Sequence, residues 1–419
     1  MIYNETRYNK HWNTKKLSEL GAFARGKSKH RPRDDERLYE GGGYPLIQTG
    51  DVKAANLYIT NHEQEYGEFG LAQSKLWDKG TLCITIAANI AETAILSYPM
   101  CFPDSVVGFT AYTKESSEKF MHYVFTYIRN SIKNSVNGSI QDNINIEYLS
   151  QLDFKVPEKS YQDKVVNVLG TIDEKIETNT RICTELESMA KRLYDYWFTQ
   201  FDFPNADGKP YRSSGGEMVW NDQLKREIPK GWGVGNLYSI ANPINGLACQ
   251  KYRPKYNEES IPVVKIKEMH DGITADTECV STNILEKYKI FDGDILFSWS
   301  ATLEVMYWFG GDAGLNQHIF KVVPINGFSK EYVYHQFSSY VVNFVKIAEA
   351  RKTTMGHITT DHLAQSRVVL PPAEIIQAFS EIVAPIHEKI GQCQKENREL
   401  TKLRDWLLPM LMNGQATVE

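Results

Sequence analysis

Residues 172–197 read IDEKIETNTRICTELESMAKRLYDYW, and residues 386–411 read IHEKIGQCQKENRELTKLRDWLLPML. Both stretches belong to a longer internal repeat, in which residues 149–198 align without a gap with residues 363–412. The aligned pairs include Leu149 with Leu363, Pro157 with Pro371, Ile172 with Ile386, Leu186 with Leu400 and Leu193 with Leu407. Weaker similarity precedes each copy, so the chain is one duplicated half-molecule.

Apolar residues recur through both copies in alternating steps of four and three, which is the spacing of a coiled coil. The first series is Val165, Leu169, Ile172, Ile176, Asn179, Cys183, Leu186, Ala190, Leu193 and Trp197. The second series is Phe379, Val383, Ile386, Ile390, Cys393, Asn397, Leu400, Arg404, Leu407 and Leu411. Two seams of one design predict two long helices that pack against each other.

The polar members of the two seams indicate the direction of the pairing. Asn179 precedes Cys183, whereas Cys393 precedes Asn397. An antiparallel pairing places the two asparagines side by side and the two cysteines side by side. A buried amide is costly unless it lies opposite a polar partner. We therefore expect an antiparallel coiled coil whose register is set by these four residues.

Each helix contains a position that disfavours helical hydrogen bonding. Pro385 lacks an N–H group, and the aligned residues in the first copy are Gly170 and Thr171. We expect both helices to kink or restart there. The main helix then runs from about 171 to 199, or roughly 43 Å at ~1.5 Å per residue. Antiparallel packing would hold the flanking regions apart, related by a pseudo-twofold axis.

The regions that precede the long helices read as short strands separated by turns. The runs are residues 44–52, 80–87 and 106–112 in the first half, and 261–266, 293–300 and 318–324 in the second. Residues 201–231 are dense in Gly, Pro, Ser and charge, which predicts a linker. The expected fold class is α+β, with two small β-rich domains separated by two long antiparallel helices.

Length and composition are consistent with this organisation. The 419 residues, 42% of them hydrophobic, suffice for two or three domains with proper cores. No apolar run reaches transmembrane length and the start is no signal peptide, so we expect a cytoplasmic chain that does not enter a membrane. The six cysteines are scattered without a CxxC pair, which favours reduced thiols over a disulfide frame or zinc site.

Charge points to a local rather than a global nucleic-acid contact. The net charge is −5, but six bases lie between Arg25 and Arg37. A flexible basic loop could bind phosphate, and its arginines could reach guanine edges. An ordinary solvated loop explains the basic stretch as well. A strand end with a β-turn at Gly50-Asp51 explains Gln48 and Thr49 equally well. The candidates in this half are Arg25, Lys27, Ser28, Lys29, Arg31 and Arg33, with Gln48 and Thr49 as base readers.

Further candidates precede the strand that leads into each long helix, and others lie in the second half. Ser, Thr, Gln and Arg at a domain edge suit DNA contacts, although they suit a plain loop almost as well. These candidates are Ser139, Gln141, Lys251, Arg253, Lys265, Lys267, Arg351, Lys352, Thr353 and Thr354.

The sequence contains no convincing catalytic motif. GAFARGKS at residues 21–28 fits the P-loop expression, but it lacks the buried strand before it and the helix after it that phosphate binding requires. No HExxH, GxSxG or amino-methyltransferase signature occurs, and no metal-ligand cluster is evident. We expect no chemistry, no metal and no cofactor on this chain.

The whole chain resembles the specificity subunit of type I restriction-modification systems. The resemblance rests on FDFPNADGKPYRSSGGEMVWNDQLKREIPKGW at 201–232, IQTGDV at 47–52, GDILFS at 293–298 and LPPAEIIQAFSEIVAPIHEKI at 370–390. It implies recognition domains at 1–156 and 232–370, spacer helices at 157–200 and 371–413, a linker at 201–231 and a tail at 414–419.

The resemblance also implies a function in phage defence. Each recognition domain would read one half of a bipartite, asymmetric target in double-stranded DNA, and the helix pair would set the gap between the halves. Two methyltransferase subunits would use S-adenosylmethionine, and restriction subunits would use ATP with magnesium. Two other functions stay open on the residues alone, a DNA-binding regulator outside restriction and a scaffold that binds no DNA.

Overall fold

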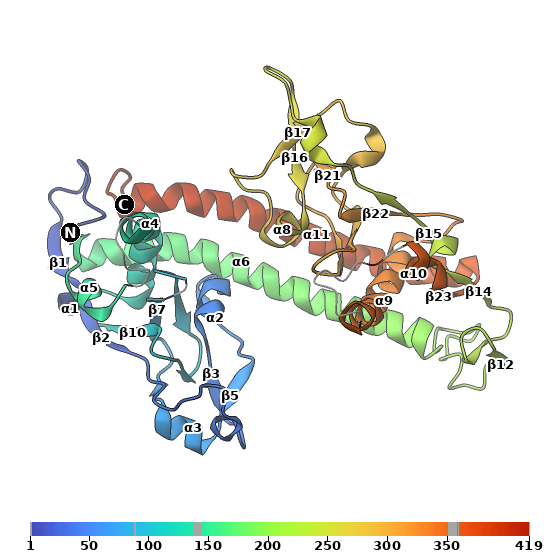
Figure 1. Cartoon of the computed structure of the whole chain (residues 1–419), viewed down its shortest axis with the longest axis horizontal. Coiled ribbons are helices and arrows are strands. Elements are labelled where there is room, and N and C mark those ends of the chain that lie inside the picture. The colour runs from blue at the N-terminus through green and yellow to red at the C-terminus, as the bar shows by residue number, and fades with distance from the viewer. Residues whose placement is uncertain (1, 88, 138–143, 351–357, 359, 419) are drawn as a thin grey trace. The chain divides into compact units, whose positions relative to one another are not determined.

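The computed structural model describes residues 2–418 except 88, 138–143, 351–357 and 359. It divides into two compact units, unit 1 (Met1–Thr178 with Asn397–Glu419) and unit 2 (Asn179–Glu396). The two long helices, α6 and α11, contribute to both units (Figure 1). Over the described ranges, no helix is long and apolar enough to cross a membrane.

Both long helices are continuous through the positions at which a break was expected. Their bounds are Lys159–Tyr194 for α6, Asp195–Thr199 for the π-helical turn after it, and Ala373–Met412 for α11. The prediction of a restart at Gly170 and Pro385, with a main helix beginning near residue 171, is therefore wrong. Pro385 is exposed while its neighbours Val383 and Ile386 are buried. Pro385 leaves the Glu381 carbonyl without its helical donor, and Glu381 is exposed as well, so this carbonyl lies on the solvent side of the helix.

Contacts within unit 1 show that its helix segments run antiparallel. Arg404 on α11 pairs with Asp173 on α6 at 3.0 Å, and the Asn397 side chain donates to the Ile176 carbonyl at 3.3 Å. Partner numbers therefore rise on one helix as they fall on the other. The predicted antiparallel pairing is confirmed.

Unit 2 has the same direction of pairing. Asn179 donates to Glu396 at 2.8 Å, and the Cys183 thiol approaches the Ile390 carbonyl at 3.7 Å. Burial, with neighbouring Cys393, raises the pKa of Cys183 to about 11. The expected pairing of Asn179 with Asn397 would join residues of different units and stays a prediction.

Unit 1 has the strand orders β1-β11, β2-β10-β7-β8-β4 and β5-β3-β9-β6. Neighbours are antiparallel except β3 with β9 and β4 with β8. Helix α4 packs on β8 and buries Phe120 and Phe125. The bounds are β1 Asn13–Lys16, α1 Leu17–Leu20, β2 Gly21–Arg25, η1 Glu36–Leu38, β3 Tyr44–Leu46, α2 Thr49–Ala54, β4 Tyr58–Ile59, β5 Gln64–Tyr66, α3 Glu68–Gln73, β6 Leu76–Trp77, β7 Leu82–Thr85, β8 Thr93–Leu96, β9 Met100–Cys101, β10 Val106–Ala111, α4 Glu118–Asn137, α5 Ile146–Ser150 and β11 Asp153–Val156.

Unit 2 repeats this plan with the strand orders β14-β23, β15-β22-β19-β20 and β17-β16-β21-β18. The parallel pair β16 and β21 corresponds to β3 and β9, and α9 corresponds to α4. The bounds are β12 Met218–Asn221, β13 Arg226–Pro229, β14 Gly233–Asn236, α7 Leu237–Ile240, β15 Ala241–Asn245, η3 Cys249–Tyr252, β16 Ser260–Val264, α8 Ile266–Asp271, β17 Cys279–Ser281, η4 Glu286–Tyr288, β18 Lys289–Ile290, β19 Ile295–Ser298, β20 Glu304–Tyr307, β21 Ala313–Leu315, β22 Ile319–Pro324, α9 Lys330–Ala350, α10 Thr360–Gln365 and β23 Arg367–Leu370. The duplication therefore extends into regions whose sequences have diverged.

All six predicted strand runs contain strands, namely β3, β7, β10, β16, β19 and β22. The alternative explanation of Gln48 and Thr49 by a β-turn at Gly50-Asp51 is wrong, because Gly50 and Asp51 both lie in the first turn of helix α2. The Gln48 backbone N–H donates to the Asp51 carboxylate at 2.7 Å, which caps the helix.

The segment that composition marks as a linker is ordered and packs within unit 2. Strands β12 and β13 form an antiparallel hairpin in it. Phe203 stacks on Tyr211 at 4.7 Å and on Trp232 at 5.1 Å, and Phe201 meets the edge of Trp232 at 5.5 Å. Its aromatic residues Phe201 and Phe203, with the adjacent Trp232, belong to the core of this unit.

Candidate nucleic-acid interface

The basic loop of unit 1 leaves strand β2 at a buried glycine. The Gly26 N–H donates to the Val106 carbonyl at 2.8 Å, and a Cβ at this residue would lie 2.3 Å from the Pro103 carbonyl oxygen. Only glycine permits this approach. The glycine thus sets where the loop begins.

The second unit uses the same device after β15. The Gly246 N–H donates to the Ile319 carbonyl at 3.1 Å, and a Cβ would lie 2.1 Å from the Asn316 carbonyl oxygen. The stretch after Gly246 carries Lys251 and Arg253, both exposed. Basic candidates that are unrelated in sequence therefore follow equivalent glycines.

Asp104 offsets much of the positive charge on the arginines of the unit 1 loop. Its carboxylate pairs with Arg33 at 2.6 Å and with Arg31 at 3.7 Å, and its carbonyl accepts from Arg25 at 3.1 Å. Phosphate would have to compete with this carboxylate for both arginines. Sequence reasoning missed Asp104, because it is distant in the chain.

Lys27 and Lys29 are the more available cations of this loop. Both side chains are exposed, and among the described residues neither ammonium group has an ion-pair partner. The loop backbone is held, since the Ser74 hydroxyl donates to the Lys27 carbonyl at 3.0 Å and the Lys29 N–H donates to Gln73 at 3.2 Å. Ser28 between them is only partly exposed. Two positive charges are thus presented on an ordered backbone.

The remaining candidates of the two units lie at matching helix starts. Gln48 and Thr49 begin α2 directly after the strand β3 region. Lys265 begins α8 after β16, where its N–H donates to the Glu268 carboxylate at 3.1 Å. Lys267 is exposed one residue into that helix. Gln48 and Lys265 are the N-cap residues of these two helices, so an amide group in unit 1 is replaced by an ammonium group in unit 2.

Beside α8 lies a polar cavity of about 280 Å³. Lys265 lines it and also pairs with Glu278 at 3.0 Å, which holds the pKa of that glutamate below its usual value. Its other polar lining residues are Gln250, Lys267, Asn316, Gln317 and His318. Amide, imidazole and ammonium groups of this kind match the donor and acceptor pattern of base edges.

Two exposed tyrosines that follow the cavity residue Gln250 in the chain were not predicted. Tyr252 is 48% exposed beside Lys251, and Tyr256 is 95% exposed. Aromatic side chains interleaved with bases at a surface suit contact with nucleic acid. The sequence signal for them is the alternation of basic and aromatic residues in KYRPKY at 251–256.

Six candidates lie outside the described residues: Ser139, Gln141, Arg351, Lys352, Thr353 and Thr354. Rejection of the P-loop is supported by the geometry. Residues 21–25 are a strand and the next helical element, η1, begins only at Glu36, so no helix N-terminus opens after Ser28.

Substituting Gly26 by alanine is expected to displace the basic loop. The new methyl group overlaps a backbone oxygen, so we expect the chain to lose about 1–3 kcal/mol of stability and to bind DNA less tightly. Gly50→Ala is the matched control, because a Cβ on Gly50 meets no atom within 4 Å. Urea unfolding and DNA titration measure both effects. Equal behaviour of the two variants would contradict this role of Gly26.

A family model described as "Type I restriction modification DNA specificity domain" matches residues 9–188 and 229–402, which cover most of both units. The chain belongs to this family. It is a specificity subunit of a type I restriction-modification system, the non-catalytic component that carries the DNA recognition domains. As such it works with other subunits and binds DNA.

Individual relatives agree with the family match. The chain is 26% identical to the type I restriction enzyme MjaIX specificity subunit of Methanocaldococcus jannaschii, over 98% of this chain and 94% of that one. It is also 26% identical to the HindI specificity subunit of Haemophilus influenzae, over 65% of this chain and 71% of that one. The crystal structure of a type I S subunit from M. genitalium shares its fold, with a TM-score of 0.57 at 15% identity over 98% and 99% of the two chains.

Proposed function

We propose that each unit of this specificity subunit reads one half of a bipartite target in double-stranded DNA, while α6 and α11 set the distance between the halves. The observation that carries the proposal is the repeated recognition frame, in which a glycine packed against a backbone carbonyl begins a loop with basic side chains and a capped helix follows a neighbouring strand. The frame is shared, but its side chains differ. The two half-sites should therefore differ in sequence.

The chemistry of the complex is assigned to partner subunits. Two methyltransferase subunits would dock on the helix pair and use S-adenosylmethionine to methylate one adenine in each half. Restriction subunits would use ATP with magnesium for translocation and cleavage. The complex would act in the cytoplasm.

Neutralising the exposed cations of one unit is expected to weaken DNA binding and its salt dependence. For Lys27→Ala/Lys29→Ala we expect the slope of log affinity against log salt to fall by about 2, because each lysine that contacts a phosphate contributes about 1. Lys251→Ala/Arg253→Ala should act similarly in unit 2. Fluorescence anisotropy of the assembled complex, on the target identified by mapping adenine methylation, measures the slope.

Two comparisons make this test specific. Lys225→Ala/Lys230→Ala removes two exposed bases from the hairpin β12–β13 region and should leave the slope unchanged. On DNA with one half scrambled, the two recognition-loop variants should respond to different halves. An equal fall of the salt slope in the Lys225→Ala/Lys230→Ala control would refute the assignment. So would sensitivity of both recognition-loop variants to scrambling of the same half of the DNA.

A further inference from the structure

Unit 2 contains a cavity of about 730 Å³ where α9 and β20 meet the helix pair. Aromatic rings line much of it. Tyr307 lies 4.6 Å from both Tyr334 and His387, and Tyr194 lies 5.1 Å from His335, measured between ring centroids. A cavity of this size and composition suits a small ligand.

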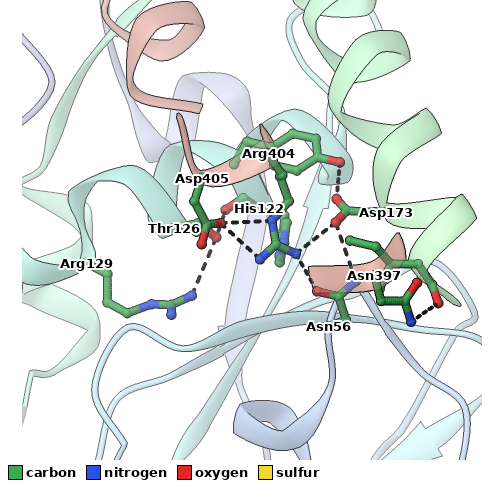
Figure 2. A network of polar contacts seen from close by, with 10 residues as sticks. Asn56, His122, Thr126, Arg129, Asp173, Asn397, Arg404 and Asp405 are labelled. Carbon is green, nitrogen blue, oxygen red and sulfur yellow. Dashed lines mark hydrogen bonds and ion pairs between the residues drawn. The ribbon is translucent and has the colours of Figure 1, made fainter. Parts of the chain in front are cut away.

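In unit 1, the place that corresponds to this cavity is occupied by ion pairs. Figure 2 shows Arg404 between Asp173 and Asn56, with bonds of 3.0 and 2.6 Å. The Tyr123 hydroxyl donates to Asp173 at 2.6 Å. Only about 140 Å³ of space remains.

A second carboxylate of this unit 1 network, Glu92, is also neutralised within the chain. Arg129 and Lys133 on α4 pair with it at 2.9 and 2.8 Å. Three cations thus pair with Asp173 and Glu92, and one of them, Arg404, also pairs with the exposed Asp405 at 3.0 Å.

The correspondence between the two places can be traced residue by residue. The helix repeat matches Asp173 with His387 and Arg404 with Ala190. Glu92 matches Glu304, since their backbone N–H groups donate to the hydroxyls of Thr85 at 3.0 Å and Ser298 at 3.1 Å in equivalent strand pairs. One acidic residue is therefore retained in unit 2.

The cations of α4 have no counterparts on α9. Both helices begin at a serine whose hydroxyl accepts from the third residue on, Ser117 from Phe120 and Ser329 from Tyr332, each at 3.2 Å. This alignment matches Arg129 with Val341 and Lys133 with Val345. All three cations of unit 1 are thus apolar residues in unit 2.

The charges that line the unit 2 cavity are mainly negative. Glu187, Asp195 and Glu304 line it with one lysine, Lys191, which pairs with Asp195. Glu304 lies 3.3 Å from His270, a pair that is charged only when the histidine is protonated. The two lining histidines supply no charge near neutral pH, because burial lowers the pKa of His335 to about 3 and that of His387 to about 4.

Buried polar atoms of the lining lack partners. His335 is 4% exposed and its Nε2 has no hydrogen bond within the described structure. The same holds for Nδ1 of His387, which is 7% exposed, and for the Tyr307 hydroxyl. Such groups cost free energy when left unsatisfied. Each of them can accept a hydrogen bond.

We propose that this cavity binds an organic cation through a guanidinium or alkylammonium group, which takes the place that Arg404, Arg129 and Lys133 occupy in unit 1. Glu304 and Glu187 supply the negative charge. The faces of Tyr307 and Tyr334 supply cation–π contacts, and the buried histidine nitrogens accept from the N–H groups.

Calorimetric titration of the full-length chain with spermidine and with the peptide Gly-Arg-Gly, at about 0.15 M salt, tests the proposal. We expect saturable binding of one equivalent. Binding of spermidine alone identifies a free polyamine as the ligand type, and binding of the peptide alone identifies an arginine side chain of a protein. Binding of neither overturns the proposal.

Variants locate the binding. Glu304→Gln and Tyr307→Leu should each weaken it at least tenfold, and Val341→Arg should abolish it, because the new guanidinium pairs with Glu304 as Arg129 pairs with Glu92. Glu286→Gln, whose glutamate is 71% exposed and pairs only with Lys289 among the described residues, is the matched control. Circular dichroism checks folding. Equal affinity in the control and the cavity variants would assign the heat to nonspecific surface binding and overturn the proposal.

Discussion

Inserting one helical turn into both long helices is expected to change which DNA the complex methylates. Four residues added between Thr178 and Asn179, and four between Glu396 and Asn397, lengthen the paired helices by about 6 Å. If the helices set the gap between half-sites, the target should gain one or two base pairs of spacer at ~3.4 Å each. Methylation of the original target should then fall to background, while each half-site sequence stays unchanged. Methylation mapping in cells measures both.

Insertion into α6 alone provides the control. Because the helices pair antiparallel, an unmatched turn shifts one seam against the other, buries polar residues against apolar ones and should reduce stability without creating a new target. An unchanged spacer in the matched double insertion would contradict the proposed ruler, even if binding remained strong.

Removing Arg404 is expected to cause the largest loss of stability from a single side chain in unit 1. Arg404→Ala leaves Asp173, whose side chain is 2% exposed, without its guanidinium partner at 3.0 Å. Breaking a buried pair in this way costs about 3–5 kcal/mol, because the carboxylate stays buried without an opposite charge and keeps only neutral hydrogen-bond donors such as Tyr123. The midpoint of urea unfolding, followed in unit 1 by a local fluorescent label, measures the loss.

Two variants bracket this result. Arg404→Ala/Asp173→Ala removes both charges and should recover part of the loss. Lys402→Ala removes a pair with Glu399 on the same helix whose side chains are 66% and 64% exposed, and it should cost no more than about 0.5 kcal/mol. A loss for Arg404→Ala as small as that of Lys402→Ala would show that the network in Figure 2 does not hold unit 1 together.

Local sequence pattern predicted the structure correctly where a single feature dominates the free energy of folding. The heptad seams predicted the two helices, and the order of Asn179, Cys183, Cys393 and Asn397 predicted their antiparallel direction. Pattern failed where a competing local effect had to be weighed. Pro385 is tolerated because it faces solvent, and Gly50 lies in a helix because Asp51 caps the start of that helix.

The candidate nucleic-acid interface could likewise be predicted only in part from the sequence. Basic residues could be found by type and spacing, but the charge available at each could not. Asp104 reaches the arginines of the loop only because β2 and β10 pair. That contact favours Lys27 and Lys29 over Arg31 and Arg33 as phosphate ligands.

The sequence by itself determined the duplication, the long helices and their antiparallel pairing, because a repeated apolar seam has to be buried and the order of its polar members favours one direction. Only the tertiary structure decided which acidic residues of the two copies are neutralised by cations. Whether an acidic residue is neutralised depends on cations from other elements. Glu92 has Arg129 and Lys133, whereas the positions equivalent to these two cations hold Val341 and Val345 in the unit of its counterpart Glu304. Charge balance in a folded chain is set by neighbours in space, which no local stretch of sequence contains.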